Sequence, residues 1–86
     1  MSNTTKRLFF LDGDSRIRFV ARVENIQRAL DIAAEDLKRV RPGFKVYYYR
    51  FFENARSTWI DFGSHIEFYF LTDKTDAELE AEYGVQ

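Results

Sequence analysis

The segment STWIDFGSHIEFYFL, residues 57–71, contains the chain's one tryptophan and one histidine and forms the centre of the predicted sheet. Apolar side chains recur at every second position, namely Ile60, Phe62, Ile66, Phe68 and Phe70. The alternate positions carry Trp59, Asp61, His65, Glu67 and Tyr69, with Gly63 between them. Such alternation predicts β-structure with one buried face.

The alternation continues through Gly63 and Ser64, which two geometries allow. In the first, which we favour, one long strand bends at Gly63, because a missing Cβ permits a kink or bulge. In the second, residues 63–65 form a three-residue hairpin loop that pairs Phe62 with Ile66. A two-residue loop would instead place Phe62 opposite His65, and we reject it because charge would then face the apolar set.

Two strands, a helix and a further strand precede this segment. Residues 7–11 and 16–23 form a hairpin around the turn DGDS, and Ile17, Phe19, Ala21 and Val23 share one side of the second strand. Asn25 is a helix N-cap, and apolar residues at spacings of three and four predict an amphipathic helix over residues 26–41 that Pro42-Gly43 ends. Residues 44–52, FKVYYYRFF, form the third strand, and residues 53–56 form a turn.

The C-terminal segment contains a capping box, Thr75 with Glu78, which predicts a short helix over residues 76–83 that ends at Gly84; a frayed acidic tail is the alternative. The predicted fold is therefore α+β with the order β-β-α-β-β. One amphipathic helix packs on one face of a mainly antiparallel sheet of four to five strands, and a short helical turn follows. Residues 1–86 form a single domain, with a frayed N-terminus at 1–6, a body at 7–71 and an acidic segment at 72–86.

Charge and composition restrict the function only weakly. The net charge is −1, but residues 1–71 contain 12 Lys and Arg against 9 Asp and Glu, whereas residues 72–86 contain one lysine against five acidic residues. Neither balance is strong enough to require a nucleic-acid partner. The chain has no cysteine, no apolar stretch of membrane-spanning length and no signal-peptide pattern, so we expect a cytoplasmic protein with no membrane partner.

No combination of residues predicts catalysis or metal binding. The triplet Asp61-Phe62-Gly63 matches a kinase metal-binding motif, but the other kinase motifs are absent. Ser64 and His65 are adjacent on a strand and therefore point to opposite faces, so they cannot form a catalytic pair. His65, Glu67 and Asp61 share one face of the predicted strand, and the spacing suits neighbouring ligands but leaves Asp61 remote unless the chain folds back. We expect no enzyme activity, cofactor, metal site or small-molecule substrate.

The sheet face opposite the helix is predicted to be rich in aromatic residues and arginine. One helix covers only one face, so the second face needs another partner. Its predicted residues, taken as the partner-binding set, are Arg16, Arg18, Arg22, Tyr47, Tyr49, Phe51, Trp59, His65 and Tyr69. Arginine, tyrosine and tryptophan dominate protein-interface hot spots, and the same types stack on nucleic-acid bases.

We therefore expect a non-enzymatic protein-binding module that docks this face on a partner protein or on a second copy. Single-stranded nucleic-acid binding through the same face is the alternative. In a third arrangement the C-terminal segment folds over the face and hides it. In size, lack of cysteine and interaction surface the chain resembles many small phage or prophage accessory proteins, some of which bind and block a host defence complex.

Overall fold

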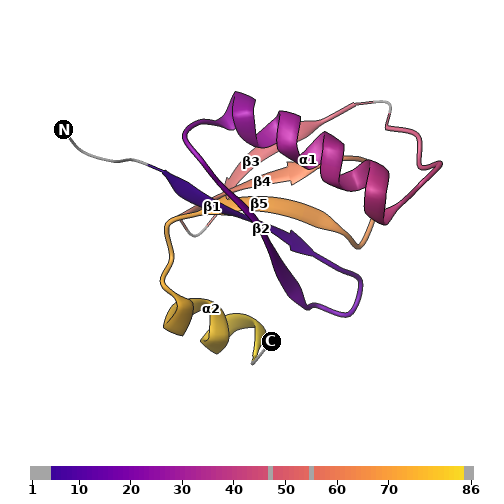
Figure 1. The fold of residues 1–86 in the computed structure, drawn as a ribbon. Coiled ribbons are helices and arrows are strands. Elements are labelled where there is room, and N and C mark those ends of the chain that lie inside the picture. The colour runs from indigo at the N-terminus through magenta and orange to yellow at the C-terminus, as the bar shows by residue number, and fades with distance from the viewer. Residues whose placement is uncertain (1–4, 47, 55, 85–86) are drawn as a thin grey trace.

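The computed structural model describes residues 5–46, 48–54 and 56–84, which form one five-stranded antiparallel sheet and two helices (Figure 1). The strands are β1 (Lys6–Leu11), β2 (Ile17–Val23), β3 (Arg50–Asn54), β4 (Ser57–Asp61) and β5 (Phe68–Thr72), and the helices are α1 (Ile26–Val40) and α2 (Asp76–Tyr83). The strand order is β2-β1-β5-β4-β3, so α1 connects the two edge strands. The predicted α+β class is confirmed, and a fifth strand is present because residues 57–71 form two strands.

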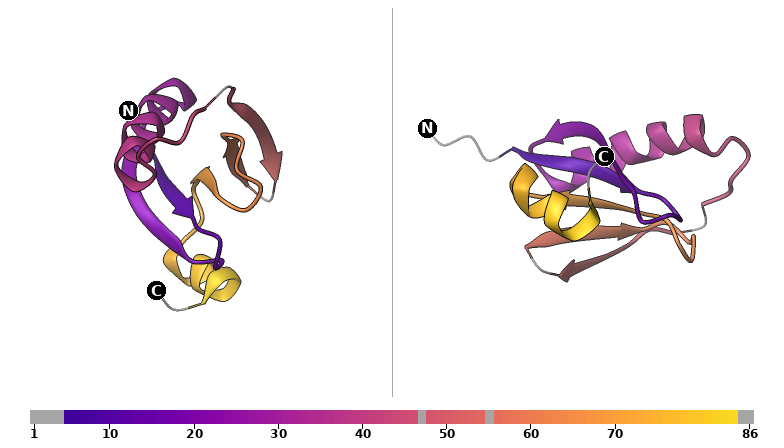
Figure 2. Two further views of the ribbon diagram at one scale, coloured as in Figure 1. Left: turned by 90° about the vertical axis from the view of Figure 1, so that its right-hand side faces the viewer. Right: turned by 90° about the horizontal axis from the view of Figure 1, so that it is seen from below.

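The two helices lie on opposite faces of the twisted sheet (Figure 2). Asn25 caps α1 by accepting a hydrogen bond from the Arg28 amide at 2.8 Å, as the sequence predicts. Ala29, Ala33 and Leu37 on α1 are buried in the main core, which also contains sheet residues such as Leu8, Phe10, Ile60 and Tyr69. Neither helix is long and apolar enough to cross a membrane, within the ranges that the structure describes.

Residues 57–71 form a hairpin, and both geometries predicted for Gly63 are wrong. Ile60 pairs with Tyr69 and Trp59 with Phe70, so residues 62–67 form the connection. The connection is stabilised by local turn contacts: Asp61 Oδ1 accepts a hydrogen bond from the Gly63 amide at 2.9 Å, and Gly63 has a φ of 102°.

This pairing also overturns the predicted single apolar face. Paired residues point to the same side of a sheet, so Ile60 lies with Tyr69 on the α1 side, whereas Phe70 lies with Trp59 on the α2 side. In the connection, Ile66 is 64% exposed rather than buried. Glu67, predicted on a polar sheet face, is buried and forms an ion pair with Arg41 just beyond α1.

A β-bulge in β2 changes which side chains share a face. Leu8 pairs with Ala21 but Phe9 pairs with Phe19, so Val20 is an extra residue without an opposite partner on β1. Ala21 therefore packs against the α1-side core with Val23, whereas Phe19 points to the α2 side. The predicted uniform alternation of β2 is wrong because period-two counting fails across an inserted residue.

The third strand begins later than predicted. β3 starts at Arg50, and the described residues in 44–49 are not in a strand. Val46 and Tyr49 instead pack against the α1-side core, which draws the chain away from the sheet before β3 begins. Gly43, with a φ of 86°, lies in the turn that follows α1. β3 pairs with β4 alone and therefore forms one edge of the sheet.

Candidate functional site

A row of aromatic residues crosses the α2 side of the sheet, with one member from each of the five strands. The strand registers pair Phe19 with Phe9, Phe9 with Phe70, Phe70 with Trp59 and Trp59 with Phe52. In order across the sheet, the row is Phe19, Phe9, Phe70, Trp59 and Phe52. Side chains at paired positions are close neighbours on one face, so the register alone brings these rings together.

The rings of the row contact one another from edge to edge of the sheet. Phe9 meets Phe19 edge-on at 5.8 Å between ring centroids and stacks on Phe70 at 5.4 Å. Trp59 stacks on Phe70 at 4.6 Å and on Phe52 at 6.2 Å. Each such pair contributes about 0.5–1.5 kcal/mol beyond its buried area. The row is therefore a continuous series of ring contacts across all five strands.

Helix α2 covers the centre of this row. Leu79 is buried in a second core with Phe9 and Phe70, and the Tyr83 ring stacks on Phe70 at 5.8 Å. The ends of the row remain open, with Phe19 51% and Phe52 46% exposed. The arrangement in which the C-terminal segment hides this face is thus observed for the centre of the row, but not for its two ends.

Charged contacts fix α2 in this position. Arg7 donates to Asp76 Oδ1 at 2.5 Å and to the Lys74 carbonyl oxygen at 2.6 Å. Arg56 donates to Glu78 at 2.7 Å, and this hydrogen bond is the main reason that the pKa of Arg56 is raised. The predicted capping box is confirmed, since Thr75 Oγ1 accepts from the Glu78 amide and Glu78 accepts from the Thr75 amide.

The β3 end of the sheet is the most open aromatic surface in the described part of the chain. All five residues of β3 are exposed, and Phe51 and Phe52 point to opposite sides at 47% and 46% exposure. Tyr48 (50% exposed) lies two residues before the strand, and Phe44 (40% exposed) lies six residues before it, edge-on to Phe62. Arg50 is over the Tyr48 ring at 5.4 Å and forms an ion pair with Asp61 at 3.2 Å.

The opposite edge, β2, is fixed to α1 by a charge network around the buried Asp36. Arg18 on β2 donates to Asp36 at 2.7 Å and 3.2 Å, and Tyr69 on β5 donates to Asp36 at 2.7 Å. Burial alone would raise the pKa of Asp36, but the hydrogen bonds from Arg18, Tyr69 and Arg39 outweigh it, and this pKa is lowered. Burial, followed by the hydrogen bond to Asp36, raises the pKa of Tyr69.

The structure does not bring the predicted binding residues onto one face. Trp59 lies in the aromatic row and Arg22 lies on the same side beside Arg7, whereas Arg18 points to Asp36 on the α1 side. Tyr69 is fully buried between the sheet and α1. The prediction of a shared face was wrong for these residues because the hairpin at 62–67 and the bulge at Val20 each invert the alternation.

The other predicted residues are divided between the β3 end and the loops. Phe51 is exposed on β3, and Tyr49 packs against the α1-side core. Arg16 and His65 are exposed next to the ends of β2 and β5. Tyr47 lies outside the described residues.

The sequence analysis missed Phe9, Phe19, Phe52 and Phe70 as members of one surface. Their common feature is strand register, which no local pattern reports. One sequence signal for the hairpin connection was available in Asp61-Phe62-Gly63-Ser64. The side chains of Asp61 and Ser64 accept hydrogen bonds from backbone amides in the turn, which these residue types commonly do. Within residues 5–46, 48–54 and 56–84, no group of three or more histidine, aspartate or glutamate side chains is placed to bind a metal.

Known proteins offer no guide to this surface: no family model, no curated protein and no solved structure matches the chain.

Proposed function

We propose that the protein is a non-enzymatic binding module that captures a partner protein at the β3 edge of its sheet. The observation that supports this most directly is the state of β3 itself. It is an edge strand, all five of its residues are exposed, and it presents an exposed phenylalanine on each side of the sheet. An edge strand has unpaired backbone donors and acceptors, which make it a template for an additional strand.

Strand addition is the binding mode that fits this geometry. An extended segment of the partner pairs with β3 through backbone hydrogen bonds, and its alternate side chains contact the two sides of the sheet. On the α2 side the contact surface is Phe52 stacked on Trp59. On the α1 side it is Phe51, which is opposite Ile60 in the β3–β4 register. The partner segment we infer is therefore extended and carries apolar side chains on both faces.

This activity suits a small cytoplasmic accessory or inhibitor protein of the phage or prophage type, which acts by occupying a site on a larger protein. A second copy of the chain is one candidate partner, since β3 has the same open edge in each copy. The set of binding residues shifts accordingly from the predicted sheet face to its β3 end, with Phe51, Phe52 and Trp59 as the anchors.

A matched pair of substitutions tests the proposal. Phe52→Lys places a charge on the β3 edge, and Phe19→Lys does the same at the other end of the same aromatic row at nearly equal exposure. We expect immobilised wild type and Phe19→Lys to retain a common partner from a lysate of the source organism, and Phe52→Lys to lose it. If Phe52→Lys retains the partner, or if both variants lose it equally, the β3 edge is not the binding site.

Light scattering behind size exclusion distinguishes self-association from binding to another protein. If the partner is a second copy, wild type and Phe19→Lys are dimers whose mass falls at low loading, and Phe52→Lys is a monomer. If all three are monomers, the second copy is excluded and the captured protein is a different chain.

Single-stranded nucleic acid is the second candidate, and the aromatic row favours it. Arg22 and Arg7 lie beside the row near one edge, and Arg50 lies near the other. Stacked rings with arginines are typical of surfaces that bind unpaired bases. Binding of an oligonucleotide that weakens steeply with salt and is lost in both Phe19→Ala and Phe52→Ala would support it. Binding that is insensitive to salt would exclude it.

A further inference from the structure

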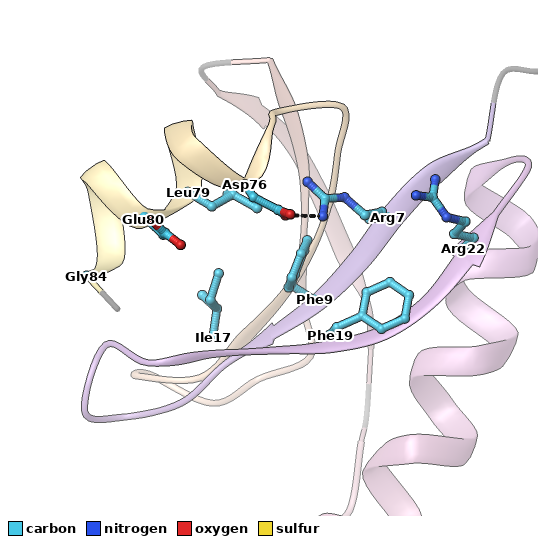
Figure 3. A pocket seen from close by; sticks show the side chains of 9 residues that line it. All are labelled: Arg7, Phe9, Ile17, Phe19, Arg22, Asp76, Leu79, Glu80 and Gly84. Carbon is cyan, nitrogen blue, oxygen red and sulfur yellow. Dashed lines mark hydrogen bonds and ion pairs between the residues drawn. The ribbon is translucent and has the colours of Figure 1, made fainter. Parts of the chain in front are cut away.

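A groove separates α2 from the β1–β2 hairpin, at the opposite edge of the sheet from β3 (Figure 3). Its volume is about 550 Å³, within the range of about 300–1,000 Å³ typical of small-molecule sites. The lining residues are Arg7, Phe9, Ile17, Phe19, Arg22, Asp76, Leu79, Glu80 and Gly84. None of them belongs to β3, so this site is separate from the proposed partner-binding edge.

The walls of the groove are apolar. Phe9, Ile17 and Leu79 pack together in the second core and are buried. Phe19 continues this surface but is 51% exposed, because α2 does not reach it. The part of the groove around Phe19 is therefore apolar surface that no described residue covers, and a ligand with an apolar body would remove it from water.

The charged residues of the groove follow one another along its length, with the Arg7–Asp76 ion pair between Glu80 at one end and Arg22 at the other (Figure 3). Arg7 and Arg22 are directly opposite each other in the β1–β2 register, so two positive charges are neighbours on one face. Asp76 compensates Arg7, whereas the guanidinium of Arg22 makes no hydrogen bond or ion pair with any residue in the described ranges. Glu80 lies at the other end, away from Arg22 (Figure 3). The Arg22 end thus has one uncompensated positive charge beside an exposed phenylalanine.

We propose that this groove binds a small amphipathic carboxylate, with its acyl or aryl body against Phe19 and Phe9 and its head group at Arg22. A guanidinium binds a carboxylate through two parallel hydrogen bonds, which gives the head a defined orientation. Asp76 and Glu80 repel further negative charge, so the geometry favours a ligand with a single anionic head. The class we assign is a medium-chain or aromatic monocarboxylate.

Decanoate is the probe that tests the head group, and 1-decanol, with the same chain and no charge, is its control. We expect decanoate to bind saturably with 1:1 stoichiometry in calorimetry and to shift backbone amide resonances of β1, β2 and α2 in NMR spectra. Decanol should bind about three- to tenfold more weakly. Arg22→Ala should weaken decanoate binding by a similar factor, whereas Arg16→Ala, which removes an exposed arginine outside the groove, should leave it unchanged.

Two phenylalanine variants test the apolar body and separate this proposal from the partner-binding proposal. Phe19→Ala should weaken the binding of decanoate and of decanol by the same factor. Phe52→Ala should leave the affinity for both ligands unchanged but should reduce capture of the partner protein. Equal affinity for decanoate and decanol, unchanged binding in Arg22→Ala, or NMR shifts confined to β3 would each overturn the proposal. Absence of saturable decanoate binding to the folded wild type would also overturn it. None of these outcomes depends on whether β3 captures a protein.

Discussion

The two edges of the sheet are built differently, although the same aromatic row ends on both of them. At the β2 edge, an extra residue, Val20, bulges out of the pairing, and Arg18 is bound to a buried aspartate on α1. At the β3 edge the pairing with β4 is regular, and all five residues are exposed.

Bulges and charged residues are the devices by which natural sheets prevent further strands from pairing at an edge. Both edges carry charged residues, Arg50 and Glu53 on β3 among them, but only the β2 edge has a bulge, whereas β3 has a regular register and two exposed phenylalanines. A sheet with one edge blocked and the other open can grow in one direction only. The comparison therefore favours β3 as the interaction edge and leaves the β2 end of the row for the groove beneath α2.

Hydrogen exchange should show the largest contrast between strands. β5 is paired on both sides and its residues 69–72 are buried, whereas β3 is paired on one side and exposed throughout. We expect β5 amides to exchange only through near-global unfolding and β3 amides to exchange through local opening, with protection factors orders of magnitude apart. β3 protection equal to that of β5 in dilute monomer would contradict an open edge. Protection of β3 that appears only with partner or at high concentration would identify its occupant.

Removing the anchor of the β2 edge should have the next largest effect. Asp36→Ala leaves Arg18 without its counter-charge and the buried Tyr69 hydroxyl without its acceptor, so we expect a loss of about 3 kcal/mol in the free energy of unfolding. Glu35→Ala is the matched control, because Glu35 is exposed and, among the described residues, its ion pair is with Lys38 in the same helix. Glu35→Ala should lower the free energy of unfolding by no more than about 0.5 kcal/mol. Similar losses in the two variants, measured by urea unfolding, would show that the network does not hold this edge.

The same network predicts a specific acid sensitivity. Because the pKa of Asp36 is lower in the folded state, its charged form contributes stability above the unfolded pKa near 4, and this contribution disappears as the pH falls through the folded value. Asp36→Asn removes the titrating carboxyl group. The free energy of unfolding of this variant should therefore fall less than that of wild type as the pH is lowered from about 5 through the folded pKa of Asp36. Parallel stability curves for the two proteins over this interval would contradict the assignment.

The smallest effect expected is on stability at the two ends of the aromatic row. Phe19→Ala and Phe52→Ala each remove a half-exposed ring with one aromatic neighbour in the row. We therefore expect each substitution to lower the free energy of unfolding by about 1 kcal/mol. The free energies of unfolding of the two variants, measured by urea denaturation, should differ by less than about 0.5 kcal/mol. A much larger loss for Phe52→Ala would mean that its effect on binding reflects unfolding of β3 rather than loss of a contact.

Signals that act over a few residues were predictable from the sequence. α1 begins after the Asn25 cap and ends just before Pro42, and α2 occupies its predicted range because Thr75 and Glu78 cap each other. The fold class followed from these helices and from the alternating apolar segments. Leu79 and Tyr83, four positions apart on α2, do pack on the sheet.

Signals that depend on pairing between strands were not predictable. Period-two counting assigned Ile60 and Phe70 to one face, but a hairpin connection at 62–67 separates them. It also assigned Phe19 and Val23 to one face, although the bulge at Val20 separates these as well. The candidate site was therefore only partly predicted: Trp59, Arg22 and Phe51 are at open or partly open positions, whereas Tyr69 is in the core.

The sequence by itself determined the helices, the α+β class and the supply of aromatic residues and arginines, because capping, amphipathic periodicity and composition are local properties of the chain. Only the tertiary structure decided which of those aromatic residues share a surface. The physical reason is that one extra residue in a strand, or one residue more in a loop, moves every following side chain to the other face of the sheet at little local cost. Burial of the whole set against α1 and α2 then selects the register that leaves the β3 edge open.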